Sequence, residues 1–368
     1  MTIFPESPQE LGEALADASA ADRSMTLSGN STKTLMAGPI AASEVTISTA
    51  RLGRVLQYEP RDLTVSVEAG ISYLELSRVL SEHRQMIPLD PPFSAHATMG
   101  GIVAANLSGP RRRLYGSARD MVIGMTFATL EGKLIRTGGM VVKNVAGLDM
   151  GKLMIGSFGT LAAIAVLNFR VHPMPPETRT FVQEFDRVRD AIAARDAVLG
   201  SQLQPSSIDL LKTRDRYRLL IRAGGSPAVL DRYSRELAQA RPIEGGEEQA
   251  LWDEICETTP RFLTNYPTGA VVRVSCPLSE VGSVMEALPA PALARAGTGV
   301  CYGYYAKATD FSRAGVLNRA VVEFAPQGFR ETFDLWPSPG SDFAMMKKIK
   351  NMLDPGSLLN RGRLYGRI

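Results

Sequence analysis

Two glycine-marked turns carry the strongest structural signal in the chain: Gly139-Met-Val-Val-Lys-Asn-Val-Ala-Gly147 and, soon after it, Gly156-Ser-Phe-Gly-Thr-Leu161. A β-rich apolar run, Ala162 to Val171, follows the second turn. Glycine lets a backbone approach a bulky planar ligand and adopt positive φ at no steric cost. Together with Pro88 to Gly109 upstream, these turns predict a binding site for an extended dinucleotide.

The composition is that of an ordinary globular protein and excludes several classes. With 368 residues, 45% hydrophobic and 21% charged, the chain is long enough for two domains. The 41 basic and 38 acidic side chains are too balanced for a nucleic-acid binder. The N-terminus lacks the basic and apolar regions of a secretory signal, and no apolar run is long enough to span a membrane. We therefore expect a cytoplasmic protein that contacts the inner membrane only through partners.

The cysteines predict neither a disulfide framework nor a metal or cluster site. Cys256, Cys276 and Cys301 are isolated in the sequence and odd in number. We interpret them as buried structural thiols and expect no metal.

Short strands alternate with helices up to about residue 172, which indicates an α+β or α/β domain. Ser7 and Glu10 predict a capped helix start, as do Ser72 and Glu75. Alternating apolar residues predict strands that include Met25 and Leu27, Val45 and Ile47, and Leu63, Val65 and Val67.

A proline-rich stretch, His172-Pro-Met-Pro-Pro176, predicts a domain boundary, because proline disfavours both helix and central strand. Beyond it we expect a second α+β domain with an antiparallel sheet and a C-terminal helix over Asp342 to Leu353. The expected elements of the second domain are strands at Thr180–Phe185, Arg218–Arg222 and Ala270–Val274 and a helix over Ser226–Ala240.

Three further segments suggest ligand contacts. Gly29-Asn-Ser-Thr-Lys33 follows a strand and offers backbone N–H groups, hydroxyls and a lysine to a pyrophosphate, although such polar turns are common. Gly100-Gly101 opens a small-residue helix, where either an anionic ligand or tight packing explains the glycines. Arg111 to Arg113 indicate a partner or anion contact, or equally a solvated basic loop.

Six motifs in this order resemble the vanillyl-alcohol-oxidase superfamily of PCMH-type FAD-binding proteins, and most of all the E subunits of glycolate oxidase (glycolate dehydrogenase). They are Val67-Glu-Ala-Gly70, Gly100-Gly101, Gly109-Pro-Arg-Arg112, Lys143-Asn-Val-Ala-Gly147, Gly156-Ser-Phe-Gly-Thr160 and Asp354-Pro-Gly-Ser-Leu-Leu-Asn-Arg-Gly-Arg-Leu364. The resemblance implies an FAD domain of two α+β subdomains at 1–172, a smaller cap domain at 177–325, and a C-terminal segment at 326–368 that returns to the FAD domain.

The resemblance also implies which residues contact FAD. By motif position these are Gly29, Asn30, Ser31, Thr32, Lys33, Ala97, Thr98, Gly100, Gly101, Ala104, Ser108, Gly109, Ser117, Gly159, Thr160 and Ile164. The chain departs from the family pattern at Asn30 and Ser31, where glycines are usual, at Leu148 in place of tyrosine, and at Ala162 in place of glycine. The altered loop implies either a reshaped pyrophosphate site or looser binding of FAD.

The histidines limit the chemistry that the resemblance implies. Covalent relatives use a histidine in the pyrophosphate loop or in the C-terminal half, and this chain has only His83, His96 and His172. We therefore expect noncovalent FAD. The hydroxyacid dehydrogenases of the family also use histidines beyond residue 172, so only His96, in the flavin-facing loop, is a weak candidate for a base.

The sequence thus predicts an FAD-binding subunit of a glycolate-oxidase-like complex that oxidises a 2-hydroxyacid such as glycolate to glyoxylate. Its partners would be a catalytic FAD subunit and an iron–sulfur subunit that receives electrons. One alternative is a self-sufficient FAD-dependent 2-hydroxyacid dehydrogenase with His96 or a tyrosine among Tyr302, Tyr304 and Tyr305 as base. Others are a non-catalytic scaffold that has lost FAD and, more weakly, a nicotinamide-linked flavin reductase.

Overall fold

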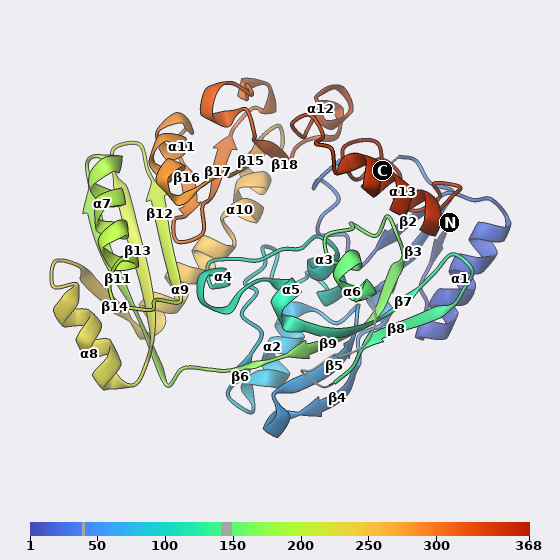
Figure 1. Cartoon of the computed structure of the whole chain (residues 1–368), viewed down its shortest axis with the longest axis horizontal. Coiled ribbons are helices and arrows are strands. Elements are labelled where there is room, and N and C mark those ends of the chain that lie inside the picture. The colour runs from blue at the N-terminus through green and yellow to red at the C-terminus, as the bar shows by residue number, and fades with distance from the viewer. Residues whose placement is uncertain (39–40, 141–148) are drawn as a thin grey trace. The chain divides into compact units, whose positions relative to one another are not determined.

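The computed structural model describes residues 1–38, 41–140 and 149–368, which form two compact units (Figure 1). The first unit comprises Met1–Leu107, Ser117–Met174 and Ser338–Ile368, and the second comprises Ser108–Gly116 and Pro175–Pro337. The chain therefore passes between units inside the proline-rich stretch, and the short basic segment 108–116 groups with the second unit.

The described residues of the first unit form two larger sheets and one two-stranded sheet. A parallel sheet has the order β1-β3-β2, with strands β1 (Thr2–Ile3), β2 (Met25–Ser28) and β3 (Val45–Ser48). An antiparallel sheet has the order β4-β5-β9-β7-β8, with strands β4 (Val55–Glu59), β5 (Thr64–Glu68), β7 (Val122–Ala128), β8 (Leu134–Gly138) and β9 (Ala163–Arg170). Helix α1 (Pro8–Ala20) buries Leu11 and Leu15 in one core with side chains from both larger sheets.

The remaining elements of this unit are short. They are α2 (Tyr73–Ser81), α3 (Met99–Ala104), α5 (Ala118–Met121), α6 (Met150–Met154), α13 (Phe343–Leu353), the paired strands β6 (Gln85–Met86) and β10 (His172–Pro173), and the 3-10 turns η1 (Thr49–Arg51) and η2 (Pro60–Asp62).

Local sequence signals correctly predicted the helix starts. The Ser7 hydroxyl accepts a hydrogen bond from the Glu10 amide at 3.2 Å, and the Ser72 hydroxyl caps α2 in the same way at 3.1 Å. Glu10 departs from the expected capping box, because its carboxylate accepts from the Glu6 amide and the Ser7 hydroxyl rather than from the Ser7 amide. Leu63 lies outside its expected strand with a φ of 55° and ends η2.

The second unit is built on one eight-stranded antiparallel sheet of order β14-β11-β13-β12-β16-β17-β15-β18. Its strands are β11 (Glu177–Phe185), β12 (Ser207–Lys212), β13 (Tyr217–Gly225), β14 (Arg241–Glu244), β15 (Ala270–Ser275), β16 (Ala292–Arg295), β17 (Val300–Tyr305) and β18 (Val321–Phe324). Its helices are α4 (Arg112–Tyr115), α7 (Val188–Leu199), α8 (Pro227–Glu236), α9 (Gly245–Cys256), α10 (Thr258–Asn265), α11 (Val281–Ala287) and α12 (Gln327–Thr332), with 3-10 turns η3 (Leu278–Glu280), η4 (Ala308–Asp310) and η5 (Gly315–Leu317). The predicted α+β class and antiparallel second sheet are confirmed.

Three details of the sequence interpretation are corrected. The helix expected to reach Ala240 ends at Glu236, because the chain must turn before β14 begins at Arg241. Only Cys301 is fully buried, whereas Cys256 and Cys276 are partly exposed. On α13 the buried side chains are Phe343 and Lys350, so the expected apolar face is interrupted by a cation.

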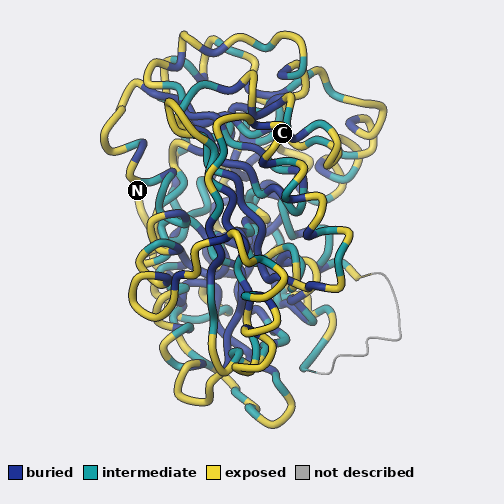
Figure 2. The backbone as a smooth tube through the Cα atoms, turned by 90° about the vertical axis from the view of Figure 1, so that its left-hand side faces the viewer, coloured by how far each residue is buried: buried dark blue, intermediate teal, exposed yellow. Residues whose placement is uncertain are grey.

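Burial differs between central and edge strands: all of β5 is buried, whereas β4 and β8 contain no fully buried residue. Figure 2 shows the buried segments mainly in the interior and the exposed segments mainly at the outside. Within the described residues, none of the helices combines the length and the apolar character needed to cross a lipid bilayer.

Candidate cofactor site

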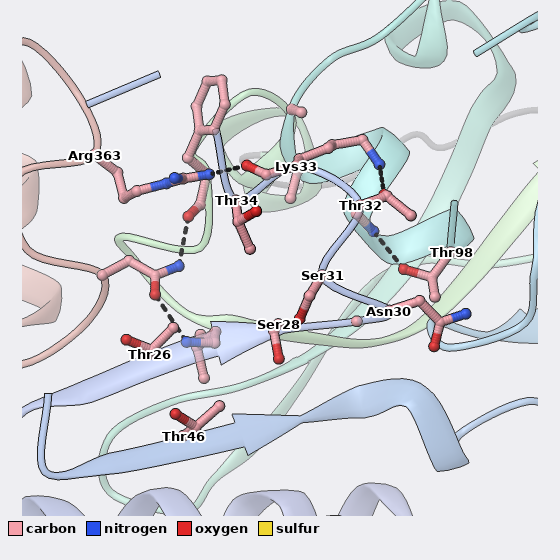
Figure 3. Close-up of a pocket in the computed structure, with 17 residues that line it drawn as sticks. Thr26, Ser28, Asn30, Ser31, Thr32, Lys33, Thr34, Thr46, Thr98 and Arg363 are labelled. Carbon is pink, nitrogen blue, oxygen red and sulfur yellow. Dashed lines mark hydrogen bonds between the residues drawn. The ribbon is translucent and has the colours of Figure 1, made fainter. Parts of the chain in front are cut away.

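A cavity of about 280 Å³ lies in the first unit, between the loop after β2, the start of α3 and the C-terminal tail (Figure 3). It is lined by the predicted residues Gly29 to Lys33, Thr98, Gly101 and Ala104. A smaller adjoining cavity of about 80 Å³ shares Gly29, Gly101 and Ala104 and adds the predicted Gly100, Gly159 and Ile164. The structure thus brings together three segments that are far apart in the sequence.

The loop after β2 takes a defined shape despite its missing glycines. The left-handed position is Ser31, with a φ of 55°. Asn30 donates from Nδ2 to the His96 carbonyl at 3.0 Å and so ties this loop to the loop before α3. A Cβ on Gly29 would lie 2.2 Å from the Thr98 hydroxyl, so the first glycine is required by close packing.

The glycine pair of α3 serves two purposes. A Cβ on Gly100 would lie 2.8 Å from the Cβ of Ala69, so this glycine is needed for packing. A Cβ on Gly101 would meet only the Thr98 hydroxyl at 3.1 Å and the Lys33 ammonium at 3.6 Å, both of which line the cavity. The amides of Met99, Gly100 and Gly101 already donate to the Ile71 carbonyl, the Ala69 carbonyl and the Thr98 hydroxyl, so the first turn of this short helix has no spare N–H for an anion.

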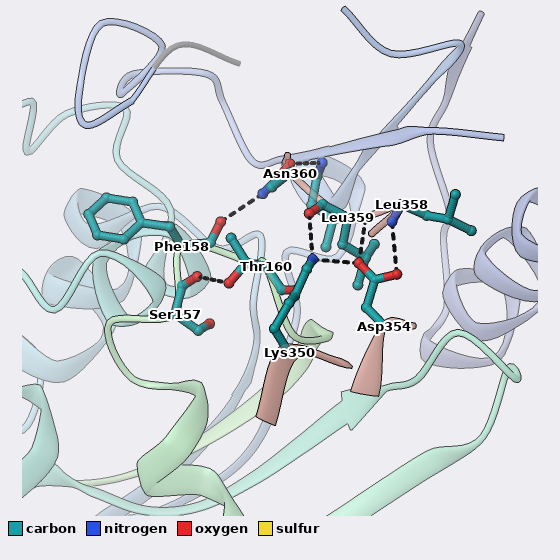
Figure 4. Close-up of polar contacts among 9 residues, drawn as sticks. Ser157, Phe158, Thr160, Lys350, Asp354, Leu358, Leu359 and Asn360 are labelled. Carbon is teal, nitrogen blue, oxygen red and sulfur yellow. Dashed lines mark hydrogen bonds and ion pairs between the residues drawn. The ribbon is translucent and has the colours of Figure 1, made fainter. Parts of the chain in front are cut away.

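The turn at 156–160 forms the wall of the smaller cavity and contains left-handed residues. Gly156, Phe158 and Gly159 have φ values of 82°, 54° and 68°. Asn360 supports the turn by donating from Nδ2 to the Phe158 carbonyl at 2.7 Å, and its Oδ1 accepts from the Leu27 amide at 2.8 Å (Figure 4). This tail residue therefore joins β2 to the glycine turn and lines both cavities.

A buried ion pair anchors the tail (Figure 4). The Lys350 ammonium donates to the Asp354 carboxylate at 2.5 Å, to the Thr160 carbonyl at 2.8 Å and to the Leu359 carbonyl at 3.1 Å. The Asp354 carboxylate in turn accepts from the amides of Leu358 and Leu359, each at 2.8 Å. Burial lowers the pKa of Lys350, and the hydrogen bond and charge of Asp354 oppose that shift.

The larger cavity fits an anionic group. Burial, and secondarily the charge of Arg363, lowers the pKa of Lys33 to about 8. Hydroxyls of Thr26, Ser28, Thr34 and Thr46 also line the cavity, and no Asp or Glu is found among its lining residues in the described part of the chain. A cation and several hydrogen-bond donors without a carboxylate suit a diphosphate.

Several predicted site residues lie elsewhere. Ala97 and Thr160 are fully buried and line neither cavity, and the amide and hydroxyl of Ser117 both donate to the Asp120 carboxylate in α5. Ser108 and Gly109 belong to the second unit. His96 is exposed and does not line either cavity, and the predicted motif from Lys143 to Gly147, with Leu148, lies outside the described residues.

Sequence reasoning missed several lining residues, among them Phe158, Asn360 and Arg363. A signal for these three was present, because Phe158 lies in the Gly156–Thr160 motif and the other two lie in the closing Asp354–Leu364 motif. These motifs indicated the family but not which of their side chains would reach the cavity.

Residues 1–138 match the family described as FAD binding domain. The matched segment is similar to FAD-binding domains of the PCMH type. FAD is thus the cofactor of the chain, and the cavities described above lie in the unit that contains this domain.

Similar proteins extend the match beyond the FAD-binding domain. Glycolate oxidase subunit GlcE of Escherichia coli is 28% identical over 98% of this chain and 97% of its own length. The mitochondrial D-lactate dehydrogenase [cytochrome] of Arabidopsis thaliana is 32% identical over 57% of this chain and 37% of its own length. These relatives place the chain among FAD-dependent oxidoreductases.

Solved structures show the same fold. A structure of alkyldihydroxyacetonephosphate synthase superposes with a TM-score of 0.71 and 17% identity over 98% of this chain and 75% of that one. At this identity the likeness extends to the fold alone.

Proposed function

We propose that this chain is the FAD-binding subunit of a glycolate-oxidase-like complex that oxidises a 2-hydroxyacid, such as glycolate to glyoxylate, and passes electrons toward an iron–sulfur partner. The observation that carries the proposal is the match to glycolate oxidase subunit GlcE along nearly the full length of both chains. FAD, when bound, would accept two electrons together and release them singly.

The chain's own residues would hold and orient the cofactor. The loop from Gly29 to Lys33 and the tail residue Asn360 line the larger cavity, and Gly159 and Ile164 line the smaller one. Lys33 supplies positive charge for the diphosphate, and the glycines allow the backbone to come close to the cofactor.

The positions of the histidines favour a subunit role over a self-sufficient dehydrogenase. His83 packs edge-on against Tyr58 with ring centroids 5.3 Å apart, His172 lies in β10, and His96 is exposed. None of the three lines either cavity within the described residues. This supports noncovalent FAD and supports a partner subunit as the source of the base that deprotonates the hydroxyacid.

The tyrosines of β17 do not supply an evident base in the second unit. Tyr304 shares a hydrogen bond with the hydroxyl of Thr259 at 3.2 Å and packs on Phe262, and burial raises its pKa to about 12. Burial also raises the pKa of Tyr302. A phenol with a raised pKa stays protonated near neutral pH, so almost no phenolate is present to act as a base.

Flavin content and anaerobic reduction test the proposal. The chain should be purified alone and with co-expressed neighbouring subunits, the released flavin counted per chain, and glycolate or D-lactate added without oxygen. We expect noncovalent FAD on this chain, slow or no bleaching of the isolated chain, and bleaching in the complex. Rapid bleaching of the isolated chain would instead identify a self-sufficient dehydrogenase, and failure to bind added FAD would identify a scaffold.

A further inference from the structure

Two cations from opposite ends of the chain line the larger cavity (Figure 3). Lys33 belongs to the loop after β2, and Arg363 belongs to the tail after α13. Arg363 donates from Nη2 to the Lys33 carbonyl at 3.2 Å and from Nη1 to the Gly38 carbonyl at 3.5 Å, and its guanidinium lies 5.7 Å from the centre of the Phe158 ring. These three contacts orient the guanidinium.

The two cations repel each other where water is scarce. The Lys33 ammonium donates to the Thr32 hydroxyl at 3.1 Å, and it forms no ion pair with any residue in the described ranges. Burial and the Arg363 charge both disfavour its protonated form. An anion placed between them would relieve both effects, because charge-assisted hydrogen bonds to phosphate are strong in a partly dry site.

We propose that Lys33 and Arg363 together hold the diphosphate of FAD. The C-terminal tail would thus contribute directly to binding of this part of the cofactor. The inference rests on the proposed function only in taking this cavity as the place where FAD binds. It assigns a binding role to Arg363, a residue of the closing Asp354–Leu364 motif that was not among the predicted FAD contacts.

The tail is built to keep Arg363 in place. Three residues upstream, Asn360 joins β2 to the glycine turn, and the Lys350–Asp354 pair fixes the end of α13 against the Thr160 carbonyl. Arg363 is itself buried, with 7% of its surface exposed. A guanidinium already oriented loses little conformational freedom when the ligand binds.

The experiment compares Arg363→Met with Arg361→Met in the full-length chain freed of flavin. Arg361 is an exposed arginine of the same tail that donates to the Ala42 carbonyl at 3.2 Å and does not line the cavity, so it is a matched control. FAD affinity is measured by quenching of flavin fluorescence, and the rise in melting temperature is measured with ADP and with adenosine. ADP carries the diphosphate and adenosine does not.

We expect Arg363→Met to raise the Kd of FAD about 10- to 100-fold, the range for loss of hydrogen bonds to a charged group. It should also abolish the stabilisation by ADP and leave that by adenosine unchanged. Arg363→Lys should recover part of the affinity, and Arg361→Met should resemble the wild type. If Arg363→Met does not fold, Lys33→Met in the same assays must show the loss for FAD and ADP.

Other results would overturn the inference. A wild-type chain that binds FAD, together with an Arg363→Met variant of equal affinity, rejects the inference while the proposed function stands. An equal loss for ADP and adenosine also rejects it, because it shows a structural role only. A wild-type chain that binds no FAD rejects the proposed function and the inference with it.

Discussion

Replacing Asp354 by alanine should both destabilise the first unit and weaken FAD binding, although Asp354 does not line the cavity. The change removes the only carboxylate that the structure pairs with Lys350 among the described residues, and it leaves the Leu358 and Leu359 amides without their acceptor. Breaking a buried ion pair by deleting one partner costs about 3–5 kcal/mol, because the other charge stays buried and unpaired. The same pair holds the tail that carries Asn360 and Arg363.

The assay is thermal unfolding followed by FAD titration. For a domain of this size, about 1 kcal/mol shifts the melting temperature by roughly 2–4 °C, so the expected drop is about 6–20 °C. Lys350→Met should cost less, because the Asp354 carboxylate would keep its two backbone amide donors. In the double variant the two costs should be less than additive, because the residues act as one pair.

Asp342→Ala is the control, because Asp342 is an exposed aspartate at the other end of α13 that makes no side-chain cap. We expect it to change stability by about 0.5 kcal/mol or less. An Asp354→Ala variant that melts within a degree of the wild type would refute the claim that the ion pair anchors the tail. Normal FAD affinity in a clearly destabilised variant would refute the link from anchor to cavity.

Three further outcomes are expected. Gly29→Ala should lower the flavin content of the purified chain, because the new Cβ would lie 2.2 Å from the Thr98 hydroxyl, whereas Gly53→Ala, with no atom within 4 Å of its new Cβ, should bind flavin normally. FAD affinity should fall as pH rises above about 8, because Lys33 in the free chain then loses its proton, whereas a bound anion raises the Lys33 pKa. Kd values for FAD measured from pH 7 to 10 check this trend. The Lys33→Met variant should show a flatter dependence of Kd on pH. Gly70→Ala should destabilise the chain by about 1–3 kcal/mol in denaturant unfolding, because its Cβ would lie 1.9 Å from a backbone oxygen of η1; an unchanged midpoint would contradict the packing argument.

Local sequence patterns were sufficient to predict features whose physical cause lies within a few residues of the chain. A hydroxyl three residues before an amide predicts a cap, and Ser7 and Ser72 both act in this way. The apolar run that forms β9 and the prolines near residue 175 likewise indicated a strand and a place where the chain passes between units. The loop at Gly29 to Lys33 was predicted because a glycine, hydroxyls and a lysine next to a strand can bind an anion.

Whatever depends on distant segments was decided by the tertiary structure. Asn360 reaches the Leu27 amide across 333 positions of the chain, and Arg363 meets Lys33 in the same way. The roles of Gly100 and Gly101 were also indistinguishable in sequence, because only the fold shows that an added Cβ would meet Ala69 at Gly100 but Thr98 and Lys33 at Gly101. Sequence alone determined that this chain carries the parts of an FAD site. Only folding could determine that a lysine and an arginine from its two ends share one cavity, because no local pattern encodes which distant side chains become neighbours.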